Sequence, residues 1–185
     1  MQQELVRRAQ EGDHEAFAAI VRGALTRLYA SARFILRDPD RAEDAVQEAL
    51  IEAWRDIADL RDADRLDAWL HRLLVRSCYR TAKRTRRREI TEVALLPSHD
   101  RSGPDGLGSL SERDQIASAF RRLTQDQRTV LTLVYFADLS LADAAVALAI
   151  PLGTMKSRLH HAMKALRAAI AADERTPQLK DGQLA

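Results

Sequence analysis

Cysteine is almost absent from this 185-residue chain, which contains one, so the sequence excludes a disulfide framework and a cysteine-based metal site. Glycine, proline and aromatic residues are also scarce, which is typical of helical proteins. No apolar run approaches the roughly 20 residues of a membrane span, and the N-terminal residues are too polar for a secretory signal. These absences predict an all-α, cytoplasmic protein without membrane insertion.

Residues 140–167 carry the most informative pattern that is present. Ser140 begins a short helix as its N-cap, with Asp143 three positions on, and the sequence AIP at 149–151 ends it. A second helix follows over 151–167, with apolar residues at steps of three and four. Its remaining faces carry four Lys/Arg and no Asp/Glu. Two helices joined by a tight turn predict a helix-turn-helix, whose second helix enters the major groove of DNA.

A second basic segment lies earlier in the chain, on a predicted helix that begins at Leu66. The stretch from Arg72 to Arg88 contains eight Lys/Arg and no acidic residue. Because such charges repel one another unless an anion offsets them, nucleic acid is the expected partner and an acidic protein surface is the alternative. The apolar spacing of the same helix predicts a buried side made of Leu66, Trp69, Leu70, Leu73, Leu74, Ser77, Cys78 and Thr81.

An acidic helix precedes this basic one. From Asp38 to Asp67 there are eleven Asp/Glu against four Arg, a net charge of −7. The outward face of the helix is expected to carry Glu43, Asp44, Gln47, Glu48 and Glu52. This face is either solvated or a docking surface for a basic partner.

The periodic segments fall into two groups separated by a polar stretch. Residues 1–89 and 110–172 are expected to form two small helical domains. Residues 90–109, with two prolines, three glycines and three serines, read as a flexible linker. An extended linker of this length reaches about 60 Å. Residues 173–185 are polar and are expected to form a flexible tail.

This layout resembles a bacterial RNA polymerase sigma factor of the sigma-70 family, of the small extracytoplasmic-function type. Two motifs carry the resemblance, DRAEDAVQEALIEAW at 40–54 and AIPLGTMKSRLHHAMKAL at 149–166. The resemblance covers residues 1–172. It implies a protein that directs the polymerase core to promoters and assists promoter opening, with no cofactor and no catalysis of its own. Its implied partners are the beta-prime clamp and beta flap of the core, promoter DNA and an anti-sigma factor.

The resemblance also implies roles for particular residues. Clamp binding falls to Asp44, Gln47 and Glu48. Reading and melting of the −10 element fall to Trp69, Arg76, Ser77, Arg80, Thr81, Lys83 and Arg84. Contact with the −35 element falls to Thr154, Lys156, Ser157, Arg158, His161 and Lys164. Ser77, Thr81 and His161 depart from the residues that are usual in the family, which leaves the promoter sequence open.

Two other functions compete with this interpretation. A helix-turn-helix regulator that acts without binding the polymerase core would explain residues 140–167 but not the basic helix at 72–88. A metal-dependent nuclease could use the shared carboxylate face of Glu43, Asp44, Glu48 and Glu52. No histidine stands at a ligand spacing from these carboxylates, which disfavours the nuclease.

Overall fold

The computed structural model describes residues 1–93 and 112–181, and within these ranges the chain is helical with no strand. The first group of helices comprises α1 (Gln2–Gln10), α2 (His14–Leu36), α3 (Pro39–Asp56), short 3-10 turns at Ile57–Asp59 and Ala63–Arg65, and α4 (Leu66–Val93). The second comprises α5 (Glu112–Arg122), α6 (Gln125–Leu131), the π-helical turn η3 (Thr132–Phe136), α7 (Leu141–Leu148) and α8 (Leu152–Asp181). The all-α prediction and its helix-turn-helix, α7 followed by α8, are confirmed.

Polar side chains fix where several helices begin. Asp13 accepts backbone hydrogen bonds at the start of α2, and Asp38 does so for α3, which has Pro39 as its first residue. Thr124 and Gln127 form a capping box on α6. The Ser140 hydroxyl accepts from the backbone N–H of Asp143 at 3.1 Å. Local sequence therefore determines the boundaries that orient the helix-turn-helix.

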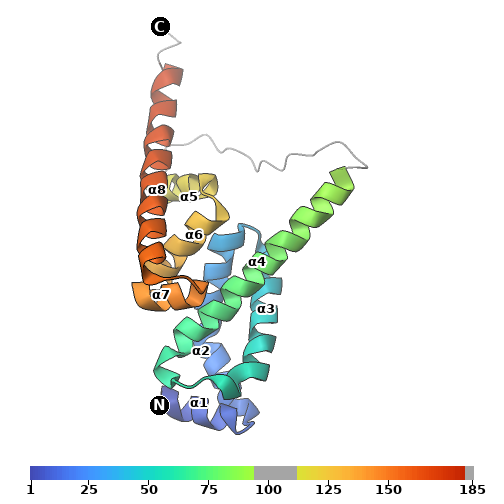
Figure 1. Cartoon of the computed structure of the whole chain (residues 1–185). Coiled ribbons are helices and arrows are strands. Elements are labelled where there is room, and N and C mark those ends of the chain that lie inside the picture. Colours follow the sequence, from blue (N-terminus) through green and yellow to red (C-terminus); the bar gives the residue numbers. More distant parts are fainter. Residues whose placement is uncertain (94–111, 182–185) are drawn as a thin grey trace.

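The first domain is built around α2, α3 and α4, which pack on one another and cover α1 at one end (Figure 1). Their apolar stripes meet in the interior, as the helical spacing predicts. Fully buried members include Leu28, Ile35, Ala45 and Leu74. Burial of these stripes is the main driving force for assembling the domain.

The helix-turn-helix of the second domain rests on α6 and η3. Ala149 ends α7 in the left-handed conformation, with φ of 53°, and its N–H bonds back to the helix. Met155 and Ala162 of α8 have no exposed surface, and Leu123 and Leu131 pack beside Ala162. The turn and the buried stripe together set which face of α8 remains outside.

The two domains pack directly against each other. Helix α7 lies on α4, and α6 and η3 lie on α2 (Figure 1). One continuous hydrophobic cluster includes Leu28 and Leu74 from the first domain and Leu133 and Met155 from the second. The sequence left open whether the domains associate, and the structure shows a closed arrangement.

Helix ends differ from the expected domain limits at two places. Helix α4 continues to Val93, into the segment expected to be linker, and α8 continues to Asp181, past the expected end of the domain at 172. The rest of the expected linker, residues 94–109, and the last residues of the tail, 182–185, lie outside the described residues. None of the helices in the described ranges combines the length and apolarity needed to cross a membrane.

Candidate functional site

The acidic surface of α3 divides into two parts. Asp44 and Gln47 are exposed, and neither has an ion pair or hydrogen bond from its side chain to another described residue. Glu48, one position further, is half-buried because its side chain turns toward α4. The first two residues are therefore available to a partner in this arrangement, whereas Glu48 is engaged within the chain.

Glu48 links α3 to the basic helix through a small polar network. Its carboxylate accepts a hydrogen bond from the Ser77 hydroxyl at 3.0 Å and pairs with Arg84 at 2.5 Å and Arg80 at 3.6 Å. Arg80 also pairs with Glu52 at 2.6 Å. Partial burial alone would raise the pKa of Glu48, but the bonds from Arg84 and Ser77 hold that pKa below its ordinary value. The acidic and basic surfaces, separate in sequence, thus neutralise each other in part.

Two residues expected to read the −10 element lie inside the first domain. Ser77 has no exposed surface and donates to Glu48, and Thr81 is 9% exposed. Their positions agree with the buried stripe predicted from helical spacing. Neither side chain can touch a base in this arrangement, so direct readout by them requires the surrounding helices to move.

The other expected −10 residues of α4 reach the surface to different degrees. Arg76, Lys83 and Arg84 are exposed, while Trp69 and Arg80 are half-buried. The expectation that the positive charges of this segment are uncompensated is wrong for Arg80 and Arg84, because each pairs with a carboxylate of α3. Arg76 and Lys83 have no such pair within the described residues and present free cationic surface.

The outer face of α8 is the most accessible of the predicted surfaces. Lys156, Ser157, Arg158, His161 and Lys164 are all exposed. Thr154, the remaining expected −35 residue, is half-buried, and its backbone carbonyl accepts a hydrogen bond from the Ser157 hydroxyl at 2.9 Å. An exposed basic helix that follows a tight turn fits the geometry that docks in a major groove.

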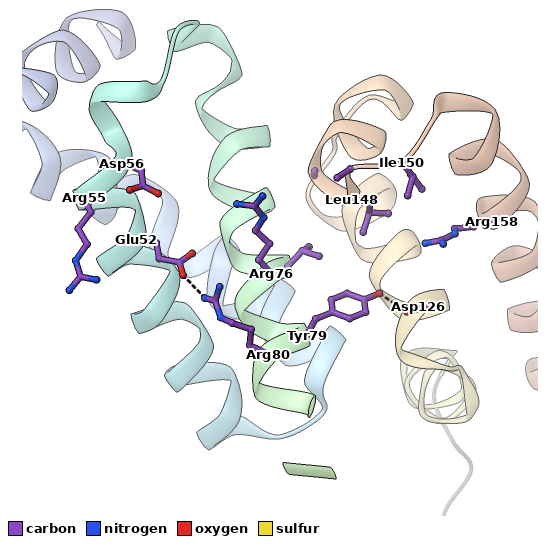
Figure 2. A pocket seen from close by; sticks show the side chains of 13 residues that line it. Glu52, Arg55, Asp56, Arg76, Tyr79, Arg80, Asp126, Leu148, Ile150 and Arg158 are labelled. Carbon is purple, nitrogen blue, oxygen red and sulfur yellow. Dashed lines mark hydrogen bonds and ion pairs between the residues drawn. The ribbon is translucent and has the colours of Figure 1, made fainter. Parts of the chain in front are cut away.

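A cleft of about 800 Å³ lies beside the contact between α4 and α7, with walls from α3 and α4 on one side and from the second domain on the other (Figure 2). Arg76 and Arg80 of α4 line one side and Arg158 of α8 lines the other, so the cleft contains two expected −10 residues and one expected −35 residue. Figure 2 also shows Tyr79 reaching across the cleft to Asp126. Two surfaces that are expected to contact separate DNA elements therefore lie side by side.

Polar contacts join the domains at three points. The Tyr79 hydroxyl donates to the Asp126 carboxylate at 2.5 Å. Arg128, only 8% exposed, donates from Nε and Nη2 to the Ile35 carbonyl at 3.0 and 2.9 Å. Arg37 donates to the Arg121 carbonyl at 2.7 Å. Sequence reasoning missed all of these, because a single arginine or tyrosine on a helix carries no sign of a long-range partner.

Burial shapes the chemistry of the remaining candidate groups. Cys78 is fully buried, and desolvation raises the pKa of its thiol to about 12, which fits the prediction of a core residue. Among the side chains that the structure describes, residues 1–87 and 116–172, no group of three or more His, Cys, Asp or Glu could hold a metal ion. The nuclease alternative therefore finds no metal site in the described part of the chain.

Comparisons with known proteins assign the family. Residues 20–88 match the family model for Sigma-70 region 2, and residues 113–166 match that for Sigma-70, region 4. The ECF RNA polymerase sigma factor EcfG of Rhodopseudomonas palustris is 33% identical over 81% of this chain and 82% of its own length. The ECF RNA polymerase sigma factor SigK of Mycolicibacterium vanbaalenii is 33% identical over 88% of this chain and 86% of its own. This chain belongs to the ECF sigma factors.

Solved structures agree with the assignment. The sigma factor RpoE of Bartonella quintana, solved in complex with the anti-sigma factor NepR, is 27% identical with a TM-score of 0.68, covering 85% of this sigma factor and 98% of that chain. CnrH, solved with the cytosolic domain of CnrY, shares the fold at 23% identity and a TM-score of 0.66, covering 93% of this chain and 98% of its own. As a sigma factor, the protein binds RNA polymerase and directs it to promoters.

Proposed function

We propose that this sigma factor divides its work among three surfaces. The exposed Asp44 and Gln47 of α3 bind the beta-prime clamp, with Glu48 orienting the helix on α4. The basic face of α4 binds the −10 element, and the second domain binds the beta flap and places α8 on the −35 element. The observation that carries the proposal is the exposed, unrelieved positive face of α8 directly after the turn at Ala149.

The closed arrangement must open for this function. Elements centred near −35 and −10 lie about 25 base pairs apart, or roughly 85 Å of duplex at 3.4 Å per base pair. In the structure, α4 and the helix-turn-helix touch, and Arg76 and Arg158 line one cleft. One molecule cannot span both elements in that state. We infer that the interdomain contacts break when the sigma factor joins polymerase and DNA.

Promoter opening would then be driven by binding alone. Separating duplex strands costs about 1.4 kcal/mol per stacked step, and cationic contacts with aromatic stacking on the single strand offset such a cost. Arg76 and Lys83 are exposed for phosphate contact, and Trp69 at the start of α4 is half-exposed for stacking. We infer that this sigma factor acts in the cytoplasm as part of the polymerase complex and is not itself an enzyme.

An anti-sigma factor is a further expected partner. The Bartonella quintana RpoE structure contains one, and its sigma chain is similar over almost its whole length. The cleft between α4 and the helix-turn-helix offers a surface that both domains share (Figure 2). A protein seated there would hold the domains together and cover Arg76 and Arg158.

In vitro transcription with polymerase core tests this function. Core with the full-length sigma factor should give discrete transcripts from a subset of genomic fragments, and core alone should not. The regulator alternative predicts the opposite pattern, a palindromic footprint on DNA without polymerase and no change in core transcription. Absence of both promoter-specific transcripts and co-purification with core would refute the proposal.

A further inference from the structure

A second cavity, of about 340 Å³, lies at the junction of the two domains. The C-terminal end of α2, the first turn of α3, one face of α4 and the start of α6 all contribute to its walls. Its volume is within the range of sites that bind small molecules. The cavity is separate from the cleft between α4 and the helix-turn-helix, because the two share no lining residue.

The lining of this cavity is strongly basic. Arg41, Arg86 and Arg128 contribute to it, and the described residues that line it include no acidic side chain. Asp38, nearby, pairs with Arg41 at 3.2 Å and offsets one charge. Arg86 has no ion pair among the described residues. Arginine presents a planar fork of donors that matches phosphate oxygens, so this set of side chains favours a phosphate.

Arg128 strengthens the positive potential from inside the protein. Its guanidinium uses three of its five N–H donors on the carbonyls of Ile35 and Leu123, which are neutral acceptors. Burial first, and then repulsion from Arg37, lower the pKa of Arg128 to about 10. A buried cation without a carboxylate partner is costly, and an anion in the cavity would relieve that cost.

Gln125 provides an independent sign of a missing acceptor. Its side-chain Nε2 is buried and makes no hydrogen bond to any described residue. A buried donor without an acceptor is unfavourable, so such groups in folded proteins usually meet a protein atom, water or a ligand. The same residue lines the cavity at the start of α6. An oxygen-rich anion would accept from this amide and from the neighbouring guanidinium groups together.

We propose that this cavity binds a small phosphate-bearing ligand, held by Arg86, Arg128 and the Gln125 amide. Arg86 belongs to the first domain and the other two residues to the second, so the ligand bridges them. Its binding would stabilise the closed arrangement and oppose opening. That regulatory consequence rests on the proposed function, whereas binding itself does not.

Calorimetric titration of the full-length protein with inorganic phosphate and with pyrophosphate tests the site, at constant ionic strength set with sodium chloride. The variants are Arg86→Ala and Gln125→Glu, which keeps the side-chain shape but replaces a donor with a negative acceptor. Arg22→Ala is the matched control, because it removes an exposed guanidinium of α2 outside the cavity. We expect saturable binding that weakens at least tenfold in both variants and is unchanged in the control. Circular dichroism should show the same helix content throughout.

Two results would overturn the proposal. One is the absence of saturable phosphate or pyrophosphate binding to the wild-type protein. The other is equal binding by the wild type, Arg86→Ala and Gln125→Glu, which would place the anion elsewhere on the basic surface. A titration with a non-promoter DNA duplex separates small anions from polyanions, since Gln125→Glu should leave duplex binding unchanged. These measurements use the protein without polymerase, so their failure is distinct from a failure of promoter-specific transcription.

Discussion

Removing one hydroxyl at the domain junction should make this sigma factor bind polymerase core more tightly. Tyr79→Phe deletes the 2.5 Å bond to Asp126 and keeps the ring that packs against the core. Burial, then the bond to Asp126, raise the pKa of Tyr79 to about 12, so the hydroxyl is a neutral donor at pH 7. Because Asp126 is exposed and can be rehydrated, we take the bond as worth about 1 kcal/mol to the closed state. A loss of that size raises the fraction of molecules with separated domains roughly fivefold. If this open state is a minor population, the apparent affinity for core rises by the same factor.

A double-mutant cycle with Asp126→Asn measures this coupling. Each single variant should raise core affinity, and the pair should gain little beyond either one. Tyr29→Phe is the matched control, because the Tyr29 hydroxyl of α2 bonds to no described residue. The prediction is refuted if Tyr79→Phe keeps its helix content but binds core no more tightly than the wild type. The contact between Tyr79 and Asp126 would then not oppose polymerase binding.

Three further predictions follow from the described contacts. Asp44→Lys should weaken core binding at least roughly tenfold without changing thermal stability, because Asp44 is exposed and has no described partner; a titration with core checks this. Glu48→Gln should lower folding stability by about 1 kcal/mol, since its ion pairs are partly exposed. It should free Arg84 for DNA, while Arg80 keeps its pair with Glu52, so the salt dependence of non-specific binding should steepen by up to about 1 in slope. Lowering the pH from 7 to 5 should destabilise the wild type more than His71→Gln in thermal melts, because burial, aided by Arg27, lowers the pKa of His71.

The sign of the pH effect follows from the imidazole's surroundings. The nitrogen Nδ1 of His71 lies 2.8 Å from the Asp67 carbonyl, and Nε2 lies 3.4 Å from the Ser31 hydroxyl. A folded-state pKa below the unfolded value means that stability is present above pH 6.5 and is lost as the unfolded chain takes up a proton below it. Equal pH slopes for the wild type and His71→Gln would contradict this. For the other two variants, the contrary results are unchanged core affinity in Asp44→Lys and an unchanged salt slope in Glu48→Gln.

Local signals in the sequence predict much of the fold. The N-cap at Ser140 is predicted from the residue type at the helix start, and the structure has it. Asp13, Asp38 and Thr124, which cap three other helices, are residue types that favour this position. Helical spacing in α4 also places Cys78 inside, where it has no exposed surface. Such features involve residues a few positions apart, so a single sequence contains the information that determines them.

For Ser77 and Thr81, the helical spacing of α4 and the family resemblance lead to different predictions. Helical spacing places both residues on the buried side of α4, whereas the resemblance implies that both contact the −10 element of the promoter. The structure buries both, and Ser77 instead donates to Glu48. A motif match shows which residue occupies an equivalent position in the sequence. Whether its side chain is accessible depends on which helices cover it.

Long-range contacts could not be predicted in this way. The bond from Arg128 to the Ile35 carbonyl joins residues 93 positions apart, and neither residue is distinctive in its local sequence. The pairing of Arg80 with Glu52 likewise depends on the packing of α3 against α4. The charge of each sequence segment predicts that Arg80 and Glu52 lie on separate charged surfaces, because the order of residues in the sequence does not reveal which surfaces meet.

The most direct test of domain opening is to measure the distance between the two domains in the transcribing complex. Probes at Arg22→Cys on α2 and Arg167→Cys on α8 occupy exposed positions in different domains, and Cys78 is buried and resists labelling. Pulsed electron paramagnetic resonance of the free protein should give one short distance. Adding core and a transcribed promoter fragment should lengthen it by tens of ångströms, as roughly 85 Å between elements demands. An unchanged distance in a complex that makes promoter-specific transcripts would contradict domain opening.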